Sequence, residues 1–124
     1  VRISERITRI GVKAFSGCES LEEITIPERV TEIADRAFSF CTNLRKVKLS
    51  EGIVRIGVSA FCECTKLRKV ELPKSVKNIC ENAFGGCRSI QEFVIPAGVK
   101  EICDLSFSFC DGLRKIYIPT GVLS

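Results

Sequence analysis

The sequence predicts a solenoid of five stacked coils of 23 residues, each with one parallel strand and a short helical or 3₁₀ turn on its return side. Two observations predict this fold class. A phenylalanine and a cysteine each recur every 23 residues, with no residue inserted or deleted between copies. The repeated residues are Phe15, Phe38, Phe61, Phe84 and Phe107, and Cys18, Cys41, Cys64, Cys87 and Cys110. Such a strict period is typical of proteins in which each repeat packs only on its neighbours.

The whole chain, residues 1–124, is predicted to be a single solenoid domain. Residues 1–6 align with the last part of a unit, and residues 122–124 open a further, truncated one. Because the chain starts at Val1 without a methionine and is cut at both ends of the array, we expect it to be a piece of a longer protein. The full repeats are residues 7–29, 30–52, 53–75, 76–98 and 99–121.

Each unit contains one segment that is expected to form a β-strand. Its apolar residues alternate with polar ones after a leading leucine or isoleucine, which is the pattern of a half-buried strand. Because the segments recur once per coil, they should stack in register as a parallel sheet. Proline follows four of them and Ser50 the fifth, and glycine comes two residues later in three units, which predicts a tight turn. The segments are residues 21–26, 44–49, 67–72, 90–95 and 113–118.

The rest of each unit, for example residues 30–41, shows no such alternation and is too short to be a stable helix by itself. An extended return with one helical or 3₁₀ turn around the Ala-Phe pair is therefore expected. Apolar positions that recur in every unit, including the phenylalanines, are predicted to form the core. Stacking the coils at roughly 4.8 Å turns each of these positions into a buried row shielded by its neighbours.

The unit reads V-x-x-I-x-x-x-A-F-x-x-C-x-x-L-x-x-I-x-I-P, and over essentially the whole chain it resembles the BspA-like bacterial surface-antigen class of leucine-rich repeats. The resemblance implies a curved, right-handed leucine-rich-repeat solenoid whose strands line one face. It also implies protein binding or adhesion, and a location at the cell surface or outside the cell. Ordinary leucine-rich repeats carry Asn after the strand, where this chain has Pro or Ser.

The eight cysteines are predicted to be structural thiols rather than a zinc site. A ladder places thiols in a row instead of converging on one point, and the chain has no histidine to complete a ligand set, so neither metal nor cofactor is expected. Buried thiols behave as small hydrophobic side chains. Neighbouring ladder positions lie near the Cα separation that a disulfide accepts, but their parallel directions argue against bridging. Oxidation could still join Cys80 to Cys103, so their redox state stays open.

The composition argues against catalysis and against several partner classes. There is no histidine and no glycine-rich phosphate loop, and no pair of acidic residues stands at positions that depart from the repeat pattern. No catalytic residue is therefore assigned. The net charge of +4 is mild, and the basic residues are not interleaved with aromatic side chains that could stack on bases. Both features disfavour nucleic acid as a partner. The apolar runs are too short for direct membrane insertion. A protein ligand, extracellular if the resemblance holds, is the expected partner.

Residues that vary from coil to coil on the outward side of the strands are the candidates for binding. In the middle of this side, six of the basic residues form a patch about three coils wide that could attract acidic protein surfaces or sulfated glycans. They are Arg45, Lys46, Lys48, Lys66, Arg68 and Lys69. The alternative is a solvated face that prevents aggregation, in which Glu71 pairs with Lys48. The chain is thus read first as a protein-binding or adhesion module, and otherwise as a structural spacer or a sulfated-glycan-binding surface. The candidate partner-binding residues are Arg45, Lys46, Lys48, Arg68, Lys69, Glu71, Arg114 and Lys115.

Apolar residues gather at the C-terminal end and predict self-association into a homo-oligomer. The candidate residues are Val94, Tyr117, Ile118 and Val122. Phe40 and Phe109 also stand where other units have glycine or glutamate. They could cover the convex side, contact a partner, or fold back on their own coil.

Overall fold

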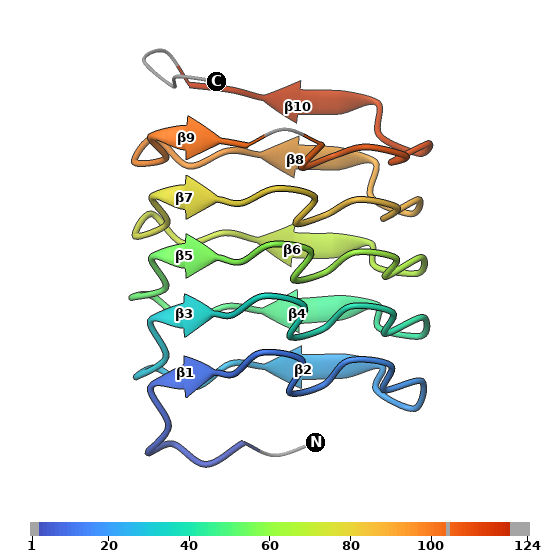
Figure 1. The fold of residues 1–124 in the computed structure, drawn as a ribbon. Coiled ribbons are helices and arrows are strands. Elements are labelled where there is room, and N and C mark those ends of the chain that lie inside the picture. The colour runs from blue at the N-terminus through green and yellow to red at the C-terminus, as the bar shows by residue number, and fades with distance from the viewer. Residues whose placement is uncertain (1–2, 104, 120–124) are drawn as a thin grey trace.

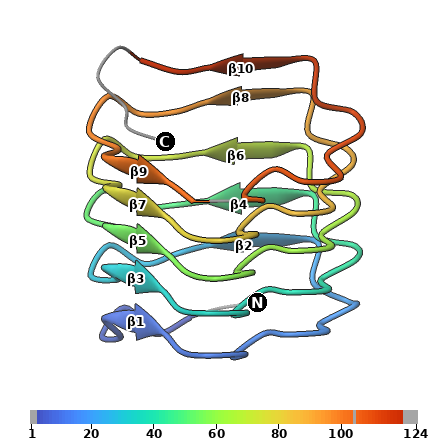
Figure 2. The same ribbon diagram turned by 45° about the horizontal axis from the view of Figure 1, so that its top comes forward.

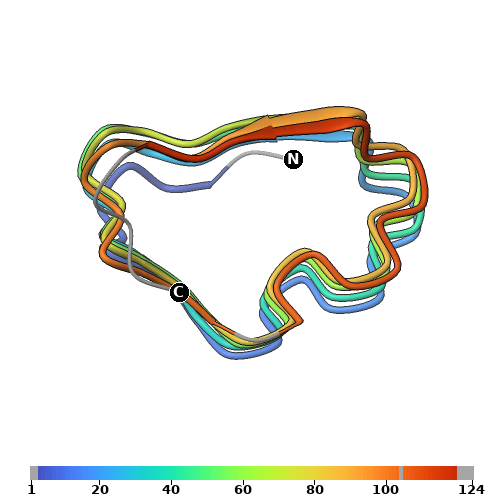
Figure 3. The same ribbon diagram turned by 90° about the horizontal axis from the view of Figure 1, so that it is seen from above.

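The computed structural model describes residues 3–103 and 105–119, which form a stack of coils (Figure 1, Figure 2). The predicted solenoid is confirmed, and the coils overlie one another when viewed along the stack (Figure 3). We number the units that begin at residues 7, 30, 53, 76 and 99 as coils 1 to 5. Each coil contributes two strands rather than the single one predicted.

One strand of each coil lies in the segment predicted from the alternating pattern, and we call the side of the solenoid that these strands form the strand face. They are β2 (Glu23–Thr25), β4 (Lys46–Lys48), β6 (Lys69–Glu71), β8 (Glu92–Val94) and β10 (Lys115–Tyr117). Their central residues point inward and their outer two residues point outward, as the alternation requires. The strands pair in parallel with a shift of one repeat, for example Ile24 opposite Val47.

The second strand of each coil lies on the return side, at the start of the unit, where sequence analysis expected only an extended connection. These strands are β1 (Arg9–Ile10), β3 (Glu32–Ile33), β5 (Arg55–Ile56), β7 (Asn78–Ile79) and β9 (Glu101–Ile102). They form one continuous parallel sheet in the order β1-β3-β5-β7-β9. Two-residue strands carry too little alternation to be recognised from sequence, so only the structure reveals them.

The strand face, in contrast, is not the continuous sheet that the sequence suggested. It is divided into a three-stranded sheet, β2-β4-β6, and a two-stranded sheet, β8-β10. In the described residues no backbone hydrogen bond joins β6 to β8. The coils are therefore joined on the return side at this level but separated on the strand face.

The expected helical or 3₁₀ turn around the Ala-Phe pair is replaced by separate turns. In coil 2 the amide of Ala37 donates to the carbonyl of Ala34, but the amide of Phe38 donates across to Ala60 in the next coil at 2.8 Å. Left-handed backbone at Arg36 and Phe40, with φ of 59° at both, makes this alternation possible. Since every second amide is used between coils, no helix forms, and the described residues contain none long and apolar enough to cross a membrane.

The repeated phenylalanines form the predicted row through the core. Neighbouring rings are stacked nearly parallel, with centroids 5.2 Å apart between Phe38 and Phe61. Phe38, Phe61 and Phe84 are fully buried, whereas Phe15 and Phe107 at the ends of the row are half-buried. The predicted burial is thus confirmed for the middle of the stack.

The repeated cysteines have a more specific role than that of small hydrophobic residues. Each thiol in coils 2 to 5 donates a hydrogen bond of 3.1 Å to the carbonyl of the phenylalanine 26 residues earlier, as Cys64 does to Phe38. The hydrogen bond with the Cys41 thiol, together with burial, raises the pKa of Cys64, and burial raises that of Cys87. Cys64 and Cys87 therefore remain protonated donors at neutral pH, whereas the hydrogen bond with the Cys64 thiol lowers the pKa of Cys41.

Candidate binding surface

Parallel pairing of β4 with β6 brings most of the predicted basic patch together on the strand face. Lys46 lies directly opposite Lys69, and Lys48 lies opposite Glu71. Arg45 and Arg68 precede these strands, and the amide of Arg68 donates to the carbonyl of Arg45 at 3.0 Å. All the candidate partner-binding residues are exposed, as is Lys66 at the edge of the patch.

The other two basic candidates for partner binding, Arg114 and Lys115, lie apart from this patch. They lie at and just before β10, and β8 with its outward residues Glu92 and Val94 stands between β6 and β10. The basic patch therefore covers coils 2 and 3 only. Glu71 forms an ion pair with Lys69 on its own strand, at 3.3 Å, rather than with Lys48, so the expected cross-strand neutralisation is absent from the ion pairs of the described residues.

A groove of about 1440 Å³ opens on the strand face at the division between β6 and β8. Val70 and Leu72 of coil 3 line it and are only half-buried, whereas Val47 at the matching position of coil 2 is 3% exposed. Sequence analysis missed this groove. The signal that could have found it is the change of the inward residue from valine at position 70 to phenylalanine at position 93.

Phe93 explains why the two sheets separate at this level. Its ring contacts that of Phe84 at 5.0 Å and that of Phe107, in the next coil, at 4.8 Å, with tilted and edge-on geometry. Offset aromatic contacts of this kind are favourable, so the ring is held toward coil 5. Val70 is consequently left without the close neighbour that Val47 has, and the groove remains open above it.

The apolar residues predicted for self-association lie on the exposed surface of coils 4 and 5. The exposed fractions are 62% for Val94, 48% for Tyr117 and 57% for Ile118. Val122 lies outside the described residues. Phe40 and Phe109 are 54% and 73% exposed, so neither ring is folded back into its own coil.

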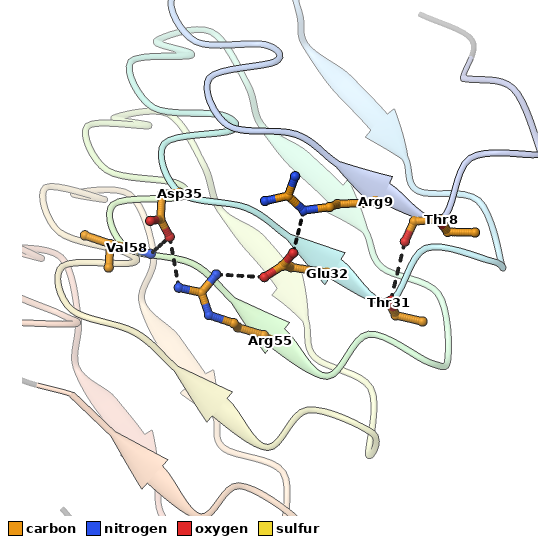
Figure 4. A network of polar contacts seen from close by, with 7 residues as sticks. All are labelled: Thr8, Arg9, Thr31, Glu32, Asp35, Arg55 and Val58. Atoms are coloured by element: carbon orange, nitrogen blue, oxygen red, sulfur yellow. Dashed lines mark hydrogen bonds and ion pairs between the residues drawn. The ribbon is translucent and has the colours of Figure 1, made fainter.

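A polar network on the return side connects coils 1, 2 and 3 (Figure 4). Glu32 accepts hydrogen bonds from Arg9 at 2.6 Å and from Arg55 at 2.9 Å. Asp35 accepts one from Arg55 at 3.0 Å and one from the amide of Val58 at 2.9 Å. The hydrogen bond from Arg9, helped by Arg55, lowers the pKa of Glu32 against the opposing effect of partial burial.

This network is structural in character. Burial alone would raise the pKa of Asp35, but the Val58 amide and the Arg55 guanidinium lower it on balance. Every acid and base in the network is paired with a residue on an adjacent coil, and none of them lines the groove on the strand face. The network therefore fastens the return side together and does not present free charge to a ligand.

All eight cysteines are separate thiols in the structure. Cys103 donates to the carboxylate of Glu101 at 3.3 Å, and burial together with that carboxylate raises the pKa of Cys103 to about 11. Burial also raises the pKa of Cys80. In residues 3–103 and 105–119, no group of three or more Cys, Asp or Glu side chains is placed to hold a metal ion.

Comparison with known proteins gives a consistent picture of the fold. A family model described as the BspA type leucine rich repeat region matches residues 1–114 in six copies. The crystal structure of a leucine-rich repeat protein from T. pallidum is 34% identical with a TM-score of 0.91, over 93% of this chain and 54% of that one. A comparison with curated proteins gives no significant match.

Two further crystal structures show the same similarity over a smaller share of their length. A leucine-rich repeat protein from Bacteroides ovatus is 36% identical with a TM-score of 0.87, over 91% of this chain and 29% of that one. A leucine rich cell surface protein from Faecalibacterium prausnitzii is 30% identical with a TM-score of 0.90, over 94% of this chain and 31% of that one. The chain thus spans about half, or less, of these structures.

Proposed function

Because the chain belongs to the BspA type leucine-rich repeat family, we propose that it is a non-catalytic module that binds another protein, or mediates adhesion, through its strand face. Membership confirms the resemblance inferred from the repeat unit and the predicted leucine-rich-repeat solenoid. Repeat solenoids commonly bind through an extended face whose framework is constant while its exposed residues vary. Here the variable residues are those of the basic patch, so the partner we propose presents an acidic surface.

The observation that supports this proposal is the placement of Lys46 directly opposite Lys69. Like charges opposite each other on adjacent strands are destabilising, and a purely structural face would favour opposite charges there. Arg45 and Arg68 add to the same field, and the ion pair of Lys69 with Glu71 offsets only one of the charges. Such a patch raises the association rate of an acidic partner.

We also propose that the protein works at the cell surface or outside the cell. The support is the relative from Faecalibacterium prausnitzii, which is described as a cell surface protein. Labelling intact cells with an antibody against this chain tests the location, because only a surface-exposed chain is stained without permeabilisation.

Retention on immobilised poly-glutamate tests the binding surface. We expect the double variant Lys46→Glu with Lys69→Glu to elute at a lower salt concentration than the unmodified chain. Such binding depends mainly on attraction between exposed charges, which salt screens. The control is Lys13→Glu with Lys77→Glu, which makes the same change in net charge at exposed residues outside the patch. It should elute at a distinctly higher salt concentration than the patch variant.

The same columns separate the alternative functions. If both double variants elute together, the patch is not a binding surface and a spacer is the better description. If the unmodified chain is held more strongly by heparin than by poly-glutamate, and only the patch variant loses this retention, a sulfated glycan replaces the protein as the partner.

Self-association through the C-terminal end is a second proposal, supported by the exposed side chains of Val94, Tyr117 and Ile118. Contiguous apolar surface of this kind usually finds a partner. Light scattering should show a dimer of the unmodified chain and a monomer of the variant Val94→Lys with Tyr117→Lys. A monomer at high micromolar concentration of the unmodified chain would contradict the proposal.

A further inference from the structure

The strand face is open at one junction between coils. Backbone groups at this junction lack hydrogen bonds that the equivalent groups form at other junctions. The amides of Arg45, Arg68 and Arg114 each donate to a carbonyl of the preceding coil, at 2.7 to 3.0 Å. Gln91 occupies the same place in coil 4, yet its amide has no backbone partner in the described part of the chain. The equivalent acceptor would be the carbonyl of Arg68, a residue that lines the groove.

The amides that follow the strands give the other end of the junction. The amide of Ile26 donates to Lys48 and that of Ile95 donates to Tyr117, each at 2.9 Å. The equivalent amides in coils 2 and 3 are those of Leu49 and Leu72, and among the described residues neither forms a backbone bond to the next coil. At the junction between coils 3 and 4, the whole of β6 is also unpaired with β8. Both β6 and β8 thus present an unpaired strand edge to the groove. Unpaired edges of this kind are templates for an added strand.

The return side at the same level is closed, so the opening is a wedge and not a break in the solenoid. Phe61 donates to Ala83 at 2.8 Å and Cys80 donates to Ile56 at 3.0 Å, across the same junction between coils 3 and 4. β5 and β7 pair in register beside them. The groove is therefore closed at its back by the hydrogen bonds of the return side.

The groove has the size and the lining of a peptide site. Its volume of about 1440 Å³ exceeds that of ordinary small-molecule pockets, which hold up to about 1,000 Å³. Val70, Leu72, Val94 and Ile95 provide apolar surface along its length. Four basic residues and two acidic ones, Glu71 and Glu92, line it, which leaves a net charge of +2. The basic residues are Arg68, Lys69, Lys74 and Arg88.

We propose that the groove between β6 and β8 binds an extended acidic peptide segment of a partner protein, which adds a strand to the exposed edges. The peptide backbone would pair with the unpaired edges of β6 and β8, including the amide of Gln91, and its inward, alternate apolar side chains would contact Val70. Its carboxylates would point outward, toward the basic rim and beside Val94. This inference rests on the proposed protein-binding function and specifies which part of the strand face holds the partner.

The test uses a blocked eight-residue peptide of alternating glutamate and valine, titrated into the full chain and followed by NMR. We expect binding with changes centred on Leu72, Gln91 and Val94, and slower exchange of the first two amides. The same peptide with N-methylated backbone should bind at least about tenfold more weakly, because it lacks the donors that strand addition needs. A lysine-valine peptide should not bind.

Two matched variants locate the site. Val94→Glu places a like charge in the groove and should weaken binding about tenfold, whereas Thr25→Glu, at the equivalent position of β2, should leave it unchanged. Lys46→Glu changes the basic patch outside the groove and should have a smaller effect than Val94→Glu.

The outcomes distinguish this inference from the proposed function. If the N-methylated peptide binds equally well, or Lys46→Glu weakens binding as much as Val94→Glu, the groove proposal is overturned while the strand face remains a binding surface. If neither the peptide nor poly-glutamate is bound at all, both proposals fail. If the chain is retained on the heparin column and binds neither the peptide nor poly-glutamate, the strand face is a glycan-binding surface and the groove proposal is also overturned.

Discussion

The return side and the strand face are built from the same five repeats, but their ladders differ. On the return side, β1, β3, β5, β7 and β9 join all the coils in one sheet. On the strand face the ladder stops between β6 and β8. A repeated backbone is therefore not sufficient for a continuous sheet, and the side chains that pack beneath it decide where the ladder continues.

The inward residues of the two sides show this dependence. Every return-side strand carries isoleucine at its inward position, and identical side chains stack with constant spacing. The strand face has valine at position 70 and phenylalanine at position 93, directly across the interrupted junction. Phe93 is packed against Phe84 and Phe107, so the mismatch in size is accommodated by an opening rather than by compression.

The largest expected effect comes from breaking the row that supports the return side. Phe61→Ala should lower the free energy of unfolding by about 3–5 kcal/mol, because a fully buried ring is replaced by a cavity. Urea denaturation followed by circular dichroism measures this loss. Phe109→Ala removes a ring that is 73% exposed and should change stability by only about 0.5 kcal/mol. Similar losses for the two variants would contradict a buried row.

A matched pair on the strand face sharpens the comparison. Val47→Ala removes a side chain that is 3% exposed and should cost about 2 kcal/mol. Val70→Ala removes the half-buried equivalent that faces the groove and should cost about 1 kcal/mol or less. The same urea experiment measures both. An equal cost would mean that Val70 is as tightly packed as Val47 and that the groove is closed.

The cysteine ladder gives a smaller effect. Cys64→Ala should cost about 1–2 kcal/mol, since it removes the thiol hydrogen bond to Phe38 and leaves a small void. Within the described residues, the Cys103 thiol has a hydrogen bond only to the carboxylate of Glu101. Cys103→Ala should therefore leave the free energy of unfolding nearly unchanged. Thermal unfolding of the two variants under reducing conditions makes the comparison, and an unchanged melting temperature for Cys64→Ala would argue against the role of the thiol.

Acidification tests the ion pairs of the return side. The pKa values of Glu32 and Asp35 are lowered in the folded protein, so their stabilisation is complete above about pH 5 and is lost as the pH falls through the folded values. Partial exposure limits the effect to at most about 1 kcal/mol. Arg55→Gln should flatten this part of the stability profile between pH 5 and pH 2, as measured by urea unfolding at each pH. An unchanged slope would show that the network is weak in solution.

Much of the fold could be predicted from the sequence because the period is strict. The five coils, the strand segments and the phenylalanine row follow from residues that repeat without insertion. The return-side strands could not be predicted, since two residues such as Arg9 and Ile10 show no usable alternation. Nor could the separate turns, because the left-handed backbone recurs at residues as different as Lys13, Ser59 and Leu105.

The candidate site was predictable only in part. The outward position of Lys46 and Lys69 follows from alternation, and their proximity follows from the constant shift between coils. The separation of Arg114 and Lys115 from this patch also follows from the repeat order, because β8 stands between β6 and β10. The groove, in contrast, depends on the placement of β8 relative to its neighbours. That placement is set by the contacts of Phe93 with two other rings, which a pattern of apolar positions does not encode.

Native-state hydrogen exchange compares the two sides at the junction between coils 3 and 4 most directly. The amides of Gln91 and Leu72 should exchange at least about tenfold faster than those of Arg68 and Ile95, which occupy equivalent places and are bonded to a neighbouring coil. The return-side amides of Phe61 and Cys80, at the same level, should be strongly protected. Equal protection of Gln91 and Arg68, and of Leu72 and Ile95, would show that the ladder is continuous and the groove closed.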